Sequence, residues 1–336
     1  MSKLISKSEK IFIAGSSGMV GSALKRALLN FGYGDEFAGG ELLTPSRKNL
    51  NLEDYSQVET WFAENKPSVV IIAAAKVGGI YANNIMPYDF LLKNLKIQTN
   101  IIEQSYKNNV KRLLFLGSSC IYPKSSKQPI IEDYLLSDSL EKTNEFYALA
   151  KIAGIKLCES LRIQHGFDAI SLMPCNLYGP GDNYHPLNSH VLPALIRKIL
   201  EAKSKGLDEI ICWGTGTPLR EFLYVEDLAE ACIYVLENWD PNKENAPRDS
   251  FGNKLSWLNV GSNFELSIKE LVEMISNQCD FEGKIKWDHT KPDGTKRKKL
   301  DISKMSDLGW EPKINLEKGI RKTISSYVKE QNIDSF

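Results

Sequence analysis

Long apolar runs and net charge are both missing from this sequence. No stretch approaches the 18 or so apolar residues that a helix needs to cross a bilayer, and 42 basic residues balance 42 acidic ones. This balance excludes a protein that binds nucleic acid through bulk positive charge. Residues 1–10 are polar, so they are not expected to form a secretory signal. These absences favour a soluble, cytoplasmic protein that binds neither a membrane nor nucleic acid.

Cysteine is scarce, and its spacing is irregular. None of the six forms a CxxC pair; they are Cys120, Cys158, Cys175, Cys212, Cys232 and Cys279. We therefore expect reduced thiols rather than a disulfide framework, and no metal site. The 336 residues, 42% of them hydrophobic, are enough for one large domain or two intimate ones with a substantial core.

Short apolar runs alternate with helical stretches over the first half of the chain. Strands are expected at 11–14, 41–44, 68–75, 113–116 and 169–173, and helices at 22–30, 91–107 and 144–161. Continuous apolar strands separated by helices are typical of a parallel sheet covered on both faces. We therefore predict an α/β fold with a Rossmann-type, doubly wound parallel sheet.

The alternation is broken after residue 177 by several glycines and prolines. Further helices are expected at 191–205, 225–237 and 267–277, strands at 210–213 and 258–260, a surface loop at 238–253 and a basic loop at 291–299. We predict that 1–177 form the Rossmann domain, with a returning segment near 222–265. Residues 178–221 and 266–336 would form a smaller C-terminal α/β domain.

Glycines mark the connection from the first strand to the first helix. The turn consists of Gly15, Ser16, Ser17, Gly18, Met19, Val20 and Gly21. Glycines there let backbone N–H groups approach a pyrophosphate at the helix N-terminus, where the dipole favours negative charge. Three glycines also mark ordinary turns, but the strand–turn–helix context favours a dinucleotide site.

The residues around the second strand indicate which dinucleotide binds. Glu41 starts that strand and would point away from the ribose, whereas Arg47 and Lys48 come at its exit. A guanidinium there could meet a 2′-phosphate; the alternative is a pair of solvated surface cations. We therefore predict NADP(H) as the cofactor, held in part by Arg47.

Candidate catalytic residues follow the expected strand at 113–116. It runs into Ser118 and Cys120, and in an open parallel sheet ligands bind beyond the carboxyl ends of the strands. Downstream, Tyr147 and Lys151 are four residues apart on one face of an expected helix. A Lys ammonium beside a Tyr would lower the pKa of the phenol and make it a usable acid near neutral pH.

With these motifs the sequence resembles the extended short-chain dehydrogenase/reductases over nearly its whole length. The residues that carry the resemblance are the glycine turn and the segments 73–80, 117–124, 147–151, 176–180, 188–190, 213–217, 220–222 and 291–294. Segments 117–124 and 188–190 are the most specific. They are similar to those of the branch of the family that makes GDP-L-fucose from GDP-4-keto-6-deoxy-D-mannose.

The resemblance implies an NADPH-dependent oxidoreductase that epimerises C3 and C5 of this sugar and then reduces its C4 ketone. Ser118, Tyr147 and Lys151 would form the reductase triad, in which Tyr147 protonates the 4-keto oxygen. Cys120 would be the base that removes the C3 and C5 protons, and His190 the acid that returns them on the opposite face. Such an inversion needs a stabilised enolate and a proton-transfer group on each face with a pKa near neutrality.

The resemblance also implies binding residues and a partner. Beyond the glycine turn, the cofactor would contact Arg47, Leu116, Gly117, Lys151, Pro174, Asn176, Leu177 and His190. The GDP-sugar, held by the smaller domain, would contact Lys198, Trp213, Arg220 and Asp293. A homodimer would form through the helices at 91–107 and 144–161.

Several of these assignments have plain structural alternatives. Cys120 could be a small buried hydrophobe, His190 could cap the helix that follows it, and Lys198 could be an exposed cation on a helix. His185 is a rival for the catalytic acid. The basic run 296–299 is expected to be a solvated edge near the diphosphate.

Two departures from the family pattern affect these expectations. Ser16 and Ser17 stand where His and Arg are often found, and an Arg at the second position can grip the 2′-phosphate. Cys175 replaces an expected Thr next to the nicotinamide.

Other functions are left open. The scaffold could act as a C4 reductase or epimerase on another GDP-4-keto sugar, such as a heptose. A non-enzymatic NADP(H)-binding sensor would be expected to lose Ser118, Tyr147 or Lys151, and all three are present. A 4,6-dehydratase is disfavoured, because its usual Thr-acid pair is replaced here by Ser119 and Cys120.

Overall fold

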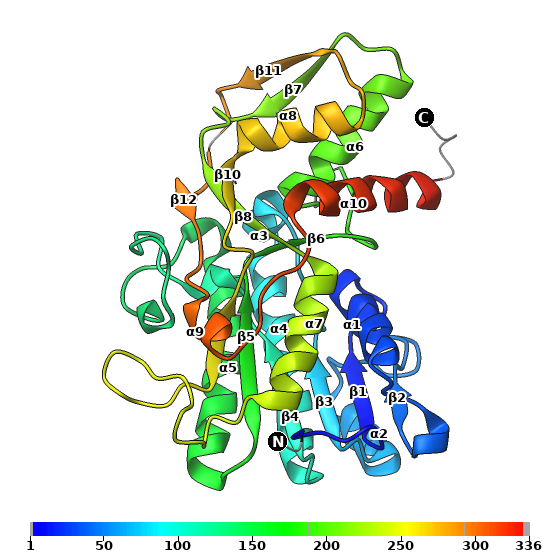
Figure 1. Cartoon of the computed structure of the whole chain (residues 1–336), viewed down its shortest axis with the longest axis vertical. Coiled ribbons are helices and arrows are strands. Elements are labelled where there is room, and N and C mark those ends of the chain that lie inside the picture. Colours follow the sequence, from blue (N-terminus) through cyan, green and yellow to red (C-terminus); the bar gives the residue numbers. More distant parts are fainter. Residues whose placement is uncertain (1–2, 187, 292, 332–336) are drawn as a thin grey trace.

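A six-stranded parallel sheet forms the centre of the computed structural model, which describes residues 3–186, 188–291 and 293–331 (Figure 1). Its strands lie in the order β2-β1-β3-β4-β5-β9. Their bounds are Lys10–Ala14 (β1), Glu41–Leu43 (β2), Val69–Ile72 (β3), Arg112–Leu116 (β4), Ala169–Pro174 (β5) and Trp257–Val260 (β9). The strand order reverses between β1 and β3, and ligands bind at such a reversal. The predicted doubly wound sheet is confirmed.

Helices cover both faces of this sheet. Helix α1 packs against α7 on one face, and α4 packs against both α2 and α5 on the other. Their bounds are Met19–Asn30 (α1), Tyr55–Asn65 (α2), Pro87–Lys107 (α4), Glu145–His165 (α5) and Val225–Asn238 (α7). All four residues of β3 are fully buried, which explains why the strands between these two layers are continuous apolar runs.

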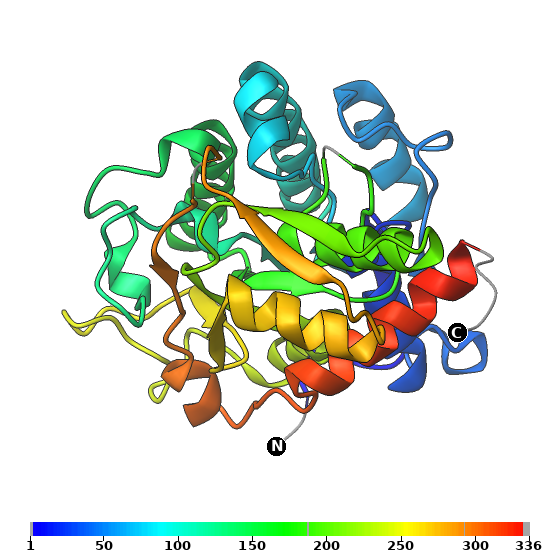
Figure 2. The ribbon, with the colours of Figure 1, turned by 90° about the horizontal axis from the view of Figure 1, so that it is seen from above.

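A smaller lobe lies beyond the carboxyl ends of the sheet (Figures 1 and 2). In it, β8 pairs with β6, β10 and β12, and β7 pairs with β11. The bounds are Asn176–Tyr178 (β6), Val191–Ser204 (α6), Glu209–Trp213 (β7), Leu219–Tyr224 (β8), Glu265–Ser267 (β10), Ile268–Gln278 (α8), Lys284–Asp288 (β11), Arg297–Lys298 (β12) and Leu316–Glu330 (α10). This lobe has a separate apolar core, to which α6, β8, α8 and α10 all contribute.

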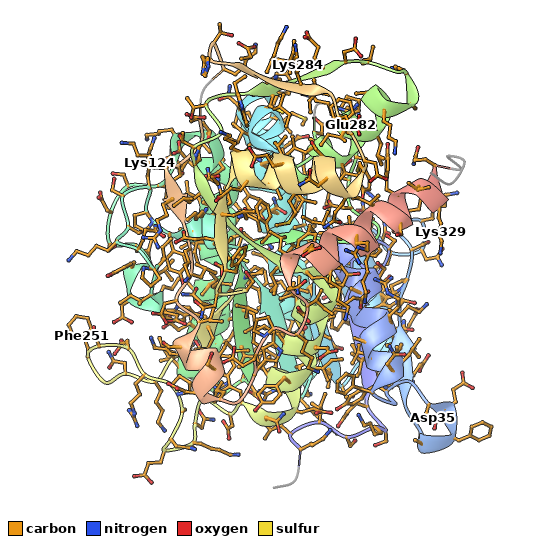
Figure 3. The ribbon with its side chains drawn as sticks, turned by 45° about the horizontal axis from the view of Figure 1, so that its top comes forward. Asp35, Lys124, Phe251, Glu282, Lys284 and Lys329 are labelled. Atoms are coloured by element: carbon orange, nitrogen blue, oxygen red, sulfur yellow. The ribbon has the colours of Figure 1, made fainter. Side chains whose placement is uncertain are left out.

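Most expected elements agree with the structure within a few residues, but several elements were not expected. These are α2, α10, the short helices Ile80–Ile85 (α3) and Ser303–Asp307 (α9), and the strands β6, β8, β10, β11 and β12. The segment 238–253 is an irregular surface loop, and Phe251 points into solvent from it (Figure 3). Among the described residues, no helix is long and apolar enough to cross a membrane.

Gly154 lies where α5 packs closely against β4. A Cβ there would lie 2.5 Å from the Phe115 ring and 2.9 Å from Gln98 Oε1. We expect Gly154→Ala to lower the free energy of unfolding by about 1–3 kcal/mol through overpacking, although alanine normally favours a helix over glycine. The control is Ala153→Gly on the exposed side of the same turn, which should cost about 1 kcal/mol at most. Urea unfolding measures both variants, and a fully stable Gly154→Ala protein would contradict this packing.

Candidate active site

The glycine turn lies between β1 and α1, where the strand order reverses. Gly15 has a φ of +84°, and a Cβ there would lie 2.7 Å from the backbone of Ala74, just after β3. A Cβ at Gly21 would lie 2.0 Å from the Gly15 carbonyl oxygen. Glycine is therefore required for α1 to start this close to the ends of both strands.

The N-terminus of α1 offers its backbone donors to a ligand. Gly18 is the N-cap residue and makes no side-chain cap hydrogen bond, and the first turn contains no acidic residue. The N–H groups of this turn and the helix dipole are what a pyrophosphate requires. A turn that has no room for side chains, and whose backbone a ligand can therefore approach closely, fits the predicted dinucleotide.

The structure places Glu41 and Arg47 at opposite ends of β2. Glu41 lies opposite Lys10 in the β1–β2 register and forms an ion pair with it, away from the glycine turn. Arg47 follows the strand; 81% of its side chain is exposed, and its Nη2 lies 2.9 Å from Glu53 Oε1. A guanidinium held this way at the surface can exchange its carboxylate partner for a phosphate.

The remaining predicted cofactor residues lie at neighbouring strand ends. Leu116 ends β4 and is followed by Gly117, Pro174 ends β5, and Asn176 and Leu177 begin β6. Asn176 Nδ2 donates a hydrogen bond to the carbonyl oxygen of Glu221 on β8 at 2.7 Å. These residues and the glycine turn therefore share the carboxyl edge of the sheet.

The turn after β4 carries Ser118 and Cys120. Ser118 Oγ accepts a hydrogen bond from the Cys120 N–H at 3.3 Å and caps a short 3-10 helix, η2 (Ser119–Ile121). Two donors approach the partly exposed thiol: Asn144 Nδ2 lies 3.3 Å and Lys298 Nζ 3.7 Å from Cys120 Sγ. An ammonium group near a thiol stabilises the thiolate. Cys120 is therefore a partly exposed thiol with polar neighbours rather than a buried packing residue.

Asn144 and Lys298 were missed by the sequence analysis. Asn144 is the last residue of the 3-10 helix η4 (Lys142–Asn144), and only its place just before α5 could have indicated it. Lys298 gives no local signal, because β12 reaches this site by pairing with β8, where Lys298 lies opposite Arg220. The expectation that 296–299 is a solvated edge is wrong for Lys298, which is only partly exposed and faces Cys120.

Tyr147 and Lys151 project from α5 toward the same turn. Tyr147 lies close enough to Ser118 for the two side chains to interact. Lys151 Nζ donates to the Leu116 carbonyl oxygen at 2.8 Å and lies 6.0 Å from the centre of the Tyr147 ring. The expected lowering of the Tyr147 pKa by Lys151 is wrong for this structure: burial and the nearby Cys120 raise that pKa, and the interaction with Ser118 offsets only part of the effect. The phenol therefore keeps its proton at neutral pH, as an acid must.

His190 is the N-cap residue of α6, but its side chain does not cap the helix. Residues 188–189, just before His190, pack against Gly79, whose N–H donates to the Asn188 carbonyl oxygen at 3.0 Å. A Cβ at Gly79 would lie 2.6 Å from the Ser189 carbonyl oxygen. The residue is exposed overall, yet the protein around its imidazole lowers its pKa by desolvation. The side chain therefore does not cap the helix. Because the lowered pKa leaves the imidazole mostly neutral at pH 7, it would have to take up a proton before it could act as an acid.

The predicted substrate residues lie on the smaller lobe. Trp213 ends β7 with 58% of its surface exposed, and Lys291 Nζ lies 5.6 Å from the centre of its ring. Lys198, on α6, donates from Nζ to the Ile211 carbonyl oxygen at 2.6 Å. An exposed indole with cations nearby can stack on a base and pair with phosphates.

Arg220 and Asp293 already have protein partners. Arg220 Nη1 donates to the carbonyl oxygens of Leu219 at 2.8 Å and Thr295 at 2.5 Å, and burial lowers its pKa. Asp293 accepts hydrogen bonds from the N–H of Thr215 at 2.9 Å and from its hydroxyl at 2.7 Å. Asp293 therefore joins its loop to the β7–β8 turn in this structure.

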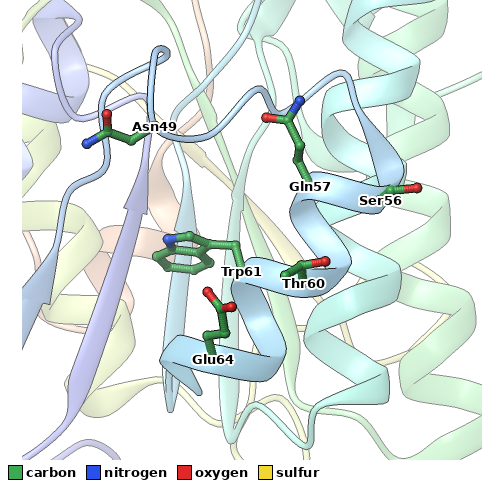
Figure 4. Close-up of a pocket in the computed structure, with 6 residues that line it drawn as sticks. All are labelled: Asn49, Ser56, Gln57, Thr60, Trp61 and Glu64. Carbon is green, nitrogen blue, oxygen red and sulfur yellow. The ribbon is translucent and has the colours of Figure 1, made fainter.

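A separate hollow of about 350 Å³ lies along α2 (Figure 4). It is lined by Asn49, Ser56, Gln57, Thr60, Trp61 and Glu64. It contains no cysteine, histidine, lysine or arginine, so it lacks the groups that the site at the strand ends brings together. In the part of the chain that the structure describes, no cluster of His, Cys, Asp and Glu could hold a metal ion.

The fold and this set of residues define a dinucleotide-dependent oxidoreductase or epimerase. Residues 11–247 match the NAD dependent epimerase/dehydratase family, and the chain belongs to it. It is 52% identical to GDP-L-fucose synthase 1 of Arabidopsis thaliana over 98% of this chain and 96% of that one. It is 46% identical to the GDP-L-fucose synthase of Escherichia coli (strain K12), over 96% and 98%.

A solved structure gives a similar match. The GDP-mannoheptose C4 reductase from Campylobacter jejuni with NADP bound is 34% identical to this chain, with a TM-score of 0.82. The match covers 96% of this chain and 99% of that one. The resemblance predicted from the motifs is therefore confirmed at the level of the family.

Burial of Lys151 predicts a pH-dependent stability. Desolvation lowers its pKa to about 7, so between pH 7 and its ordinary value near 10.5 the folded chain binds fewer protons than the unfolded one. The penalty for burying the charge is complete below pH 7 and shrinks as the pH rises. Relative to Lys151→Met, the free energy of unfolding of the wild type should increase by about 2 kcal/mol from pH 7 to pH 9. Urea unfolding at both pH values checks this, and parallel pH profiles would contradict it.

Proposed function

We propose that this protein converts GDP-4-keto-6-deoxy-D-mannose into GDP-L-fucose by inverting C3 and C5 and then reducing C4 with NADPH. The observation that carries the proposal is the grouping of a thiol with nearby cations and a Ser118–Tyr147 donor pair at one strand end. It occurs in a chain 52% identical to a GDP-L-fucose synthase over nearly its full length. The thiol with its nearby cations suits the removal of a proton beside a ketone, and the Ser118–Tyr147 pair suits the reduction of that ketone.

In the reduction, NADPH would supply the hydride that adds to C4. The Tyr147 phenol donates its proton to the resulting alkoxide oxygen, and the Ser118 hydroxyl holds that oxygen by a hydrogen bond. Lys151, anchored on the Leu116 carbonyl oxygen, holds the nicotinamide ribose and adds positive charge near the reacting carbonyl. The glycine turn binds the pyrophosphate through its backbone N–H groups.

In the epimerisation, the Cys120 thiolate removes the proton at C3 and then at C5. Each removal leaves an enolate whose oxygen is stabilised by the Ser118 and Tyr147 hydroxyl groups. His190 gives a proton to the opposite face of the sugar, which inverts the carbon. Before the second inversion the thiol loses its proton to water, and the imidazole takes one up from water. Lys298 and Asn144 favour the thiolate that starts each cycle.

The smaller lobe would bind the GDP part of the substrate. Trp213 stacks on the guanine, and Lys198 and Arg220 neutralise the diphosphate. Asp293 exchanges a hydrogen bond with Thr215 for one with a substrate hydroxyl. The separate apolar cores support a division into a Rossmann domain (1–177, with 222–265) and a substrate domain (178–221 and 266–336), although 300–310 pack on the first core.

We also propose a cytoplasmic homodimer. Helices α4 and α5 pack side by side and leave aromatic and aliphatic side chains exposed on their outer surfaces, among them Tyr88, Phe146, Leu149 and Ile163. An exposed apolar pair of helices favours association with the same pair of a second copy. All six cysteines are free thiols, which suits a reducing compartment.

A C4 reductase of another GDP-4-keto sugar is the second candidate, and the similarity to a GDP-mannoheptose C4 reductase favours it. The two functions are separated by incubating the protein with NADPH and GDP-4-keto-6-deoxy-D-mannose in heavy water. We expect NADPH oxidation and deuterium at both C3 and C5 of the product by NMR. Reduction without deuterium at these carbons would mean a plain 4-ketoreductase, and no turnover would direct the assay to GDP-heptoses.

Cys120→Ser should abolish deuterium exchange at C3 and C5, because a serine hydroxyl is too weakly acidic to form the base near neutral pH. NADPH binding should stay within about twofold of the wild type. Cys158→Ser, a buried cysteine on α5, is the control and should retain exchange. Normal exchange in Cys120→Ser, or loss of NADPH binding, would contradict the assigned role.

Arg47→Ala should weaken NADPH binding about tenfold or more, since a charge-assisted contact to the 2′-phosphate is lost. NADH binding, which involves no such phosphate, should change less than about twofold. Arg26→Ala, which removes a surface arginine paired with Glu226, serves as the control. Equal weakening of both dinucleotides, measured by fluorescence titration, would show that Arg47 does not read the 2′-phosphate.

A further inference from the structure

Glu221 is fully buried on β8, next to Arg220, and the mechanism above gives it no role. Successive side chains of a strand point to opposite faces, so Glu221 faces away from the cleft that Arg220 borders. Among the described residues, no lysine or arginine side chain lies within ion-pair distance of its carboxylate, although the more distant Lys299 favours its charged form. Burial raises the pKa of this carboxyl group. A buried carboxylate without an ion pair is expensive, and its presence calls for a reason.

Its oxygens hold backbone N–H groups from two distant segments. Oε1 accepts from the Asn263 N–H at 2.9 Å, and Oε2 accepts from the Leu300 N–H at 2.9 Å. A Cβ at Gly261 would lie 2.3 Å from Oε1. The backbone of the loop after β9 therefore packs directly against the carboxylate at Oε1. The other oxygen, Oε2, binds the Leu300 N–H.

The bond to Leu300 fixes the segment that carries Lys298. Strand β12 has two residues, and its ladder with β8 ends at Lys298 opposite Arg220. On its other side, Ile130 N–H donates to the Lys299 carbonyl oxygen at 2.8 Å. The Lys299 N–H also donates to Gln128 Oε1 at 2.8 Å, and the Asp301 N–H donates to the Ile130 carbonyl oxygen at 2.8 Å. The Glu221–Leu300 bond is the one that ties this segment to β8 beyond the end of the ladder, close to Lys298 Nζ at 3.7 Å from Cys120 Sγ.

We propose that Glu221 is a positioning residue: by holding Leu300, it keeps the Lys298 ammonium group at the Cys120 thiol and thereby maintains the thiolate for epimerisation. The role in epimerisation rests on the proposed function. The position of Lys298 and the state of the thiol can be tested without any sugar.

Other polar groups also face this thiol and its cation. Arg220 from β8, Tyr147 from α5 and Asn144 from η4 interact with Cys120. Lys298 in turn interacts with Glu141, which pairs with Lys124 at 3.1 Å, and with the buried Cys175. These groups are unchanged by the substitutions below, so a shift of the thiol titration reports on Lys298.

The test is the rate of Cys120 alkylation by iodoacetamide as a function of pH, read on the Cys120 peptide by mass spectrometry. The other five cysteines are buried. We expect Lys298→Met to move the midpoint upward, because the ammonium group 3.7 Å from the sulfur is lost. Glu221→Gln should move it in the same direction, because the amide NH₂ replaces one of the acceptors that the backbone N–H groups need.

A double variant and a matched control separate positioning from general destabilisation. In the Lys298→Met background, Glu221→Gln should cause no further shift, because its effect passes through Lys298. Asp227→Asn is the control: Asp227 is another buried carboxylate, and it accepts the Ile314 N–H at 2.9 Å. It should lower stability and leave the midpoint unchanged. An unchanged midpoint in folded Glu221→Gln, or an additive shift in the double variant, would overturn the proposal.

If Glu221→Gln does not fold, Gly261→Ala gives the same readout, because its Cβ displaces the carboxylate without removing it. A normal midpoint in that variant would also overturn the proposal. With the sugar, Glu221→Gln should reduce C3 and C5 exchange up to about tenfold at pH 7, with NADPH binding retained. A wild-type protein that does not turn over this sugar would count against the proposed function alone, since the alkylation result stands without it.

Discussion

The hydrogen-bond ladder of β8 is the constraint on which the rest of the site depends. The strand pairs with β6, which follows β5 of the main sheet, and with β10 and β12. It then leads directly into α7, which covers that sheet beside α1. Fixed in this way to both parts of the molecule, β8 brings Arg220 and, through β12, Lys298 to the strand end that carries Cys120. The residues around Cys120 are thus brought together by backbone pairing between segments far apart in the sequence.

Local patterns were enough to predict the main sheet and the residues next to it. Strands such as β3 and β4 are buried on both faces, so burial imposes a continuous apolar run that can be read without a structure. The glycine turn, Ser118, Cys120 and the Tyr147–Lys151 pair each lie within a few residues of such a strand or on one helix face. The chemistry of these residues and the strands next to them in the sequence therefore both point to the carboxyl edge of the sheet as the site.

Features that depend on distant segments could not be predicted. Strand β8 mixes apolar and charged residues because one part faces the cleft and another the core, and two residues of β12 form no pattern at all. The pKa of Tyr147 rises because of burial and Cys120, and neither is visible in a Tyr-x-x-x-Lys spacing. For His190, a helix cap and a catalytic acid would occupy the same sequence position, so the sequence could not separate them. The structure shows that the side chain makes no cap bond, and the catalytic role stays a proposal.

The electrostatics of the cleft suit two successive reactions at one oxygen. Lys151, Arg220 and Lys298 converge on it in a chain with no net charge, and burial lowers the pKa of Lys151 and of Arg220. Partly desolvated cations stabilise anions strongly. In the proposed sequence, the same 4-keto oxygen becomes an enolate twice and an alkoxide once, so one set of donors can serve all three states.

In the proposed mechanism, the raised pKa of Tyr147 influences at which reaction step this residue gives up its proton. A phenol that holds its proton tightly would donate a hydrogen bond to the enolate without giving the proton up, so the enolate carbon would stay free for reprotonation by His190. An alkoxide is a much stronger base than an enolate, and it takes the proton from the same phenol. Burial of Tyr147 beside Cys120 therefore favours carbon protonation during epimerisation and reserves oxygen protonation for the reduction.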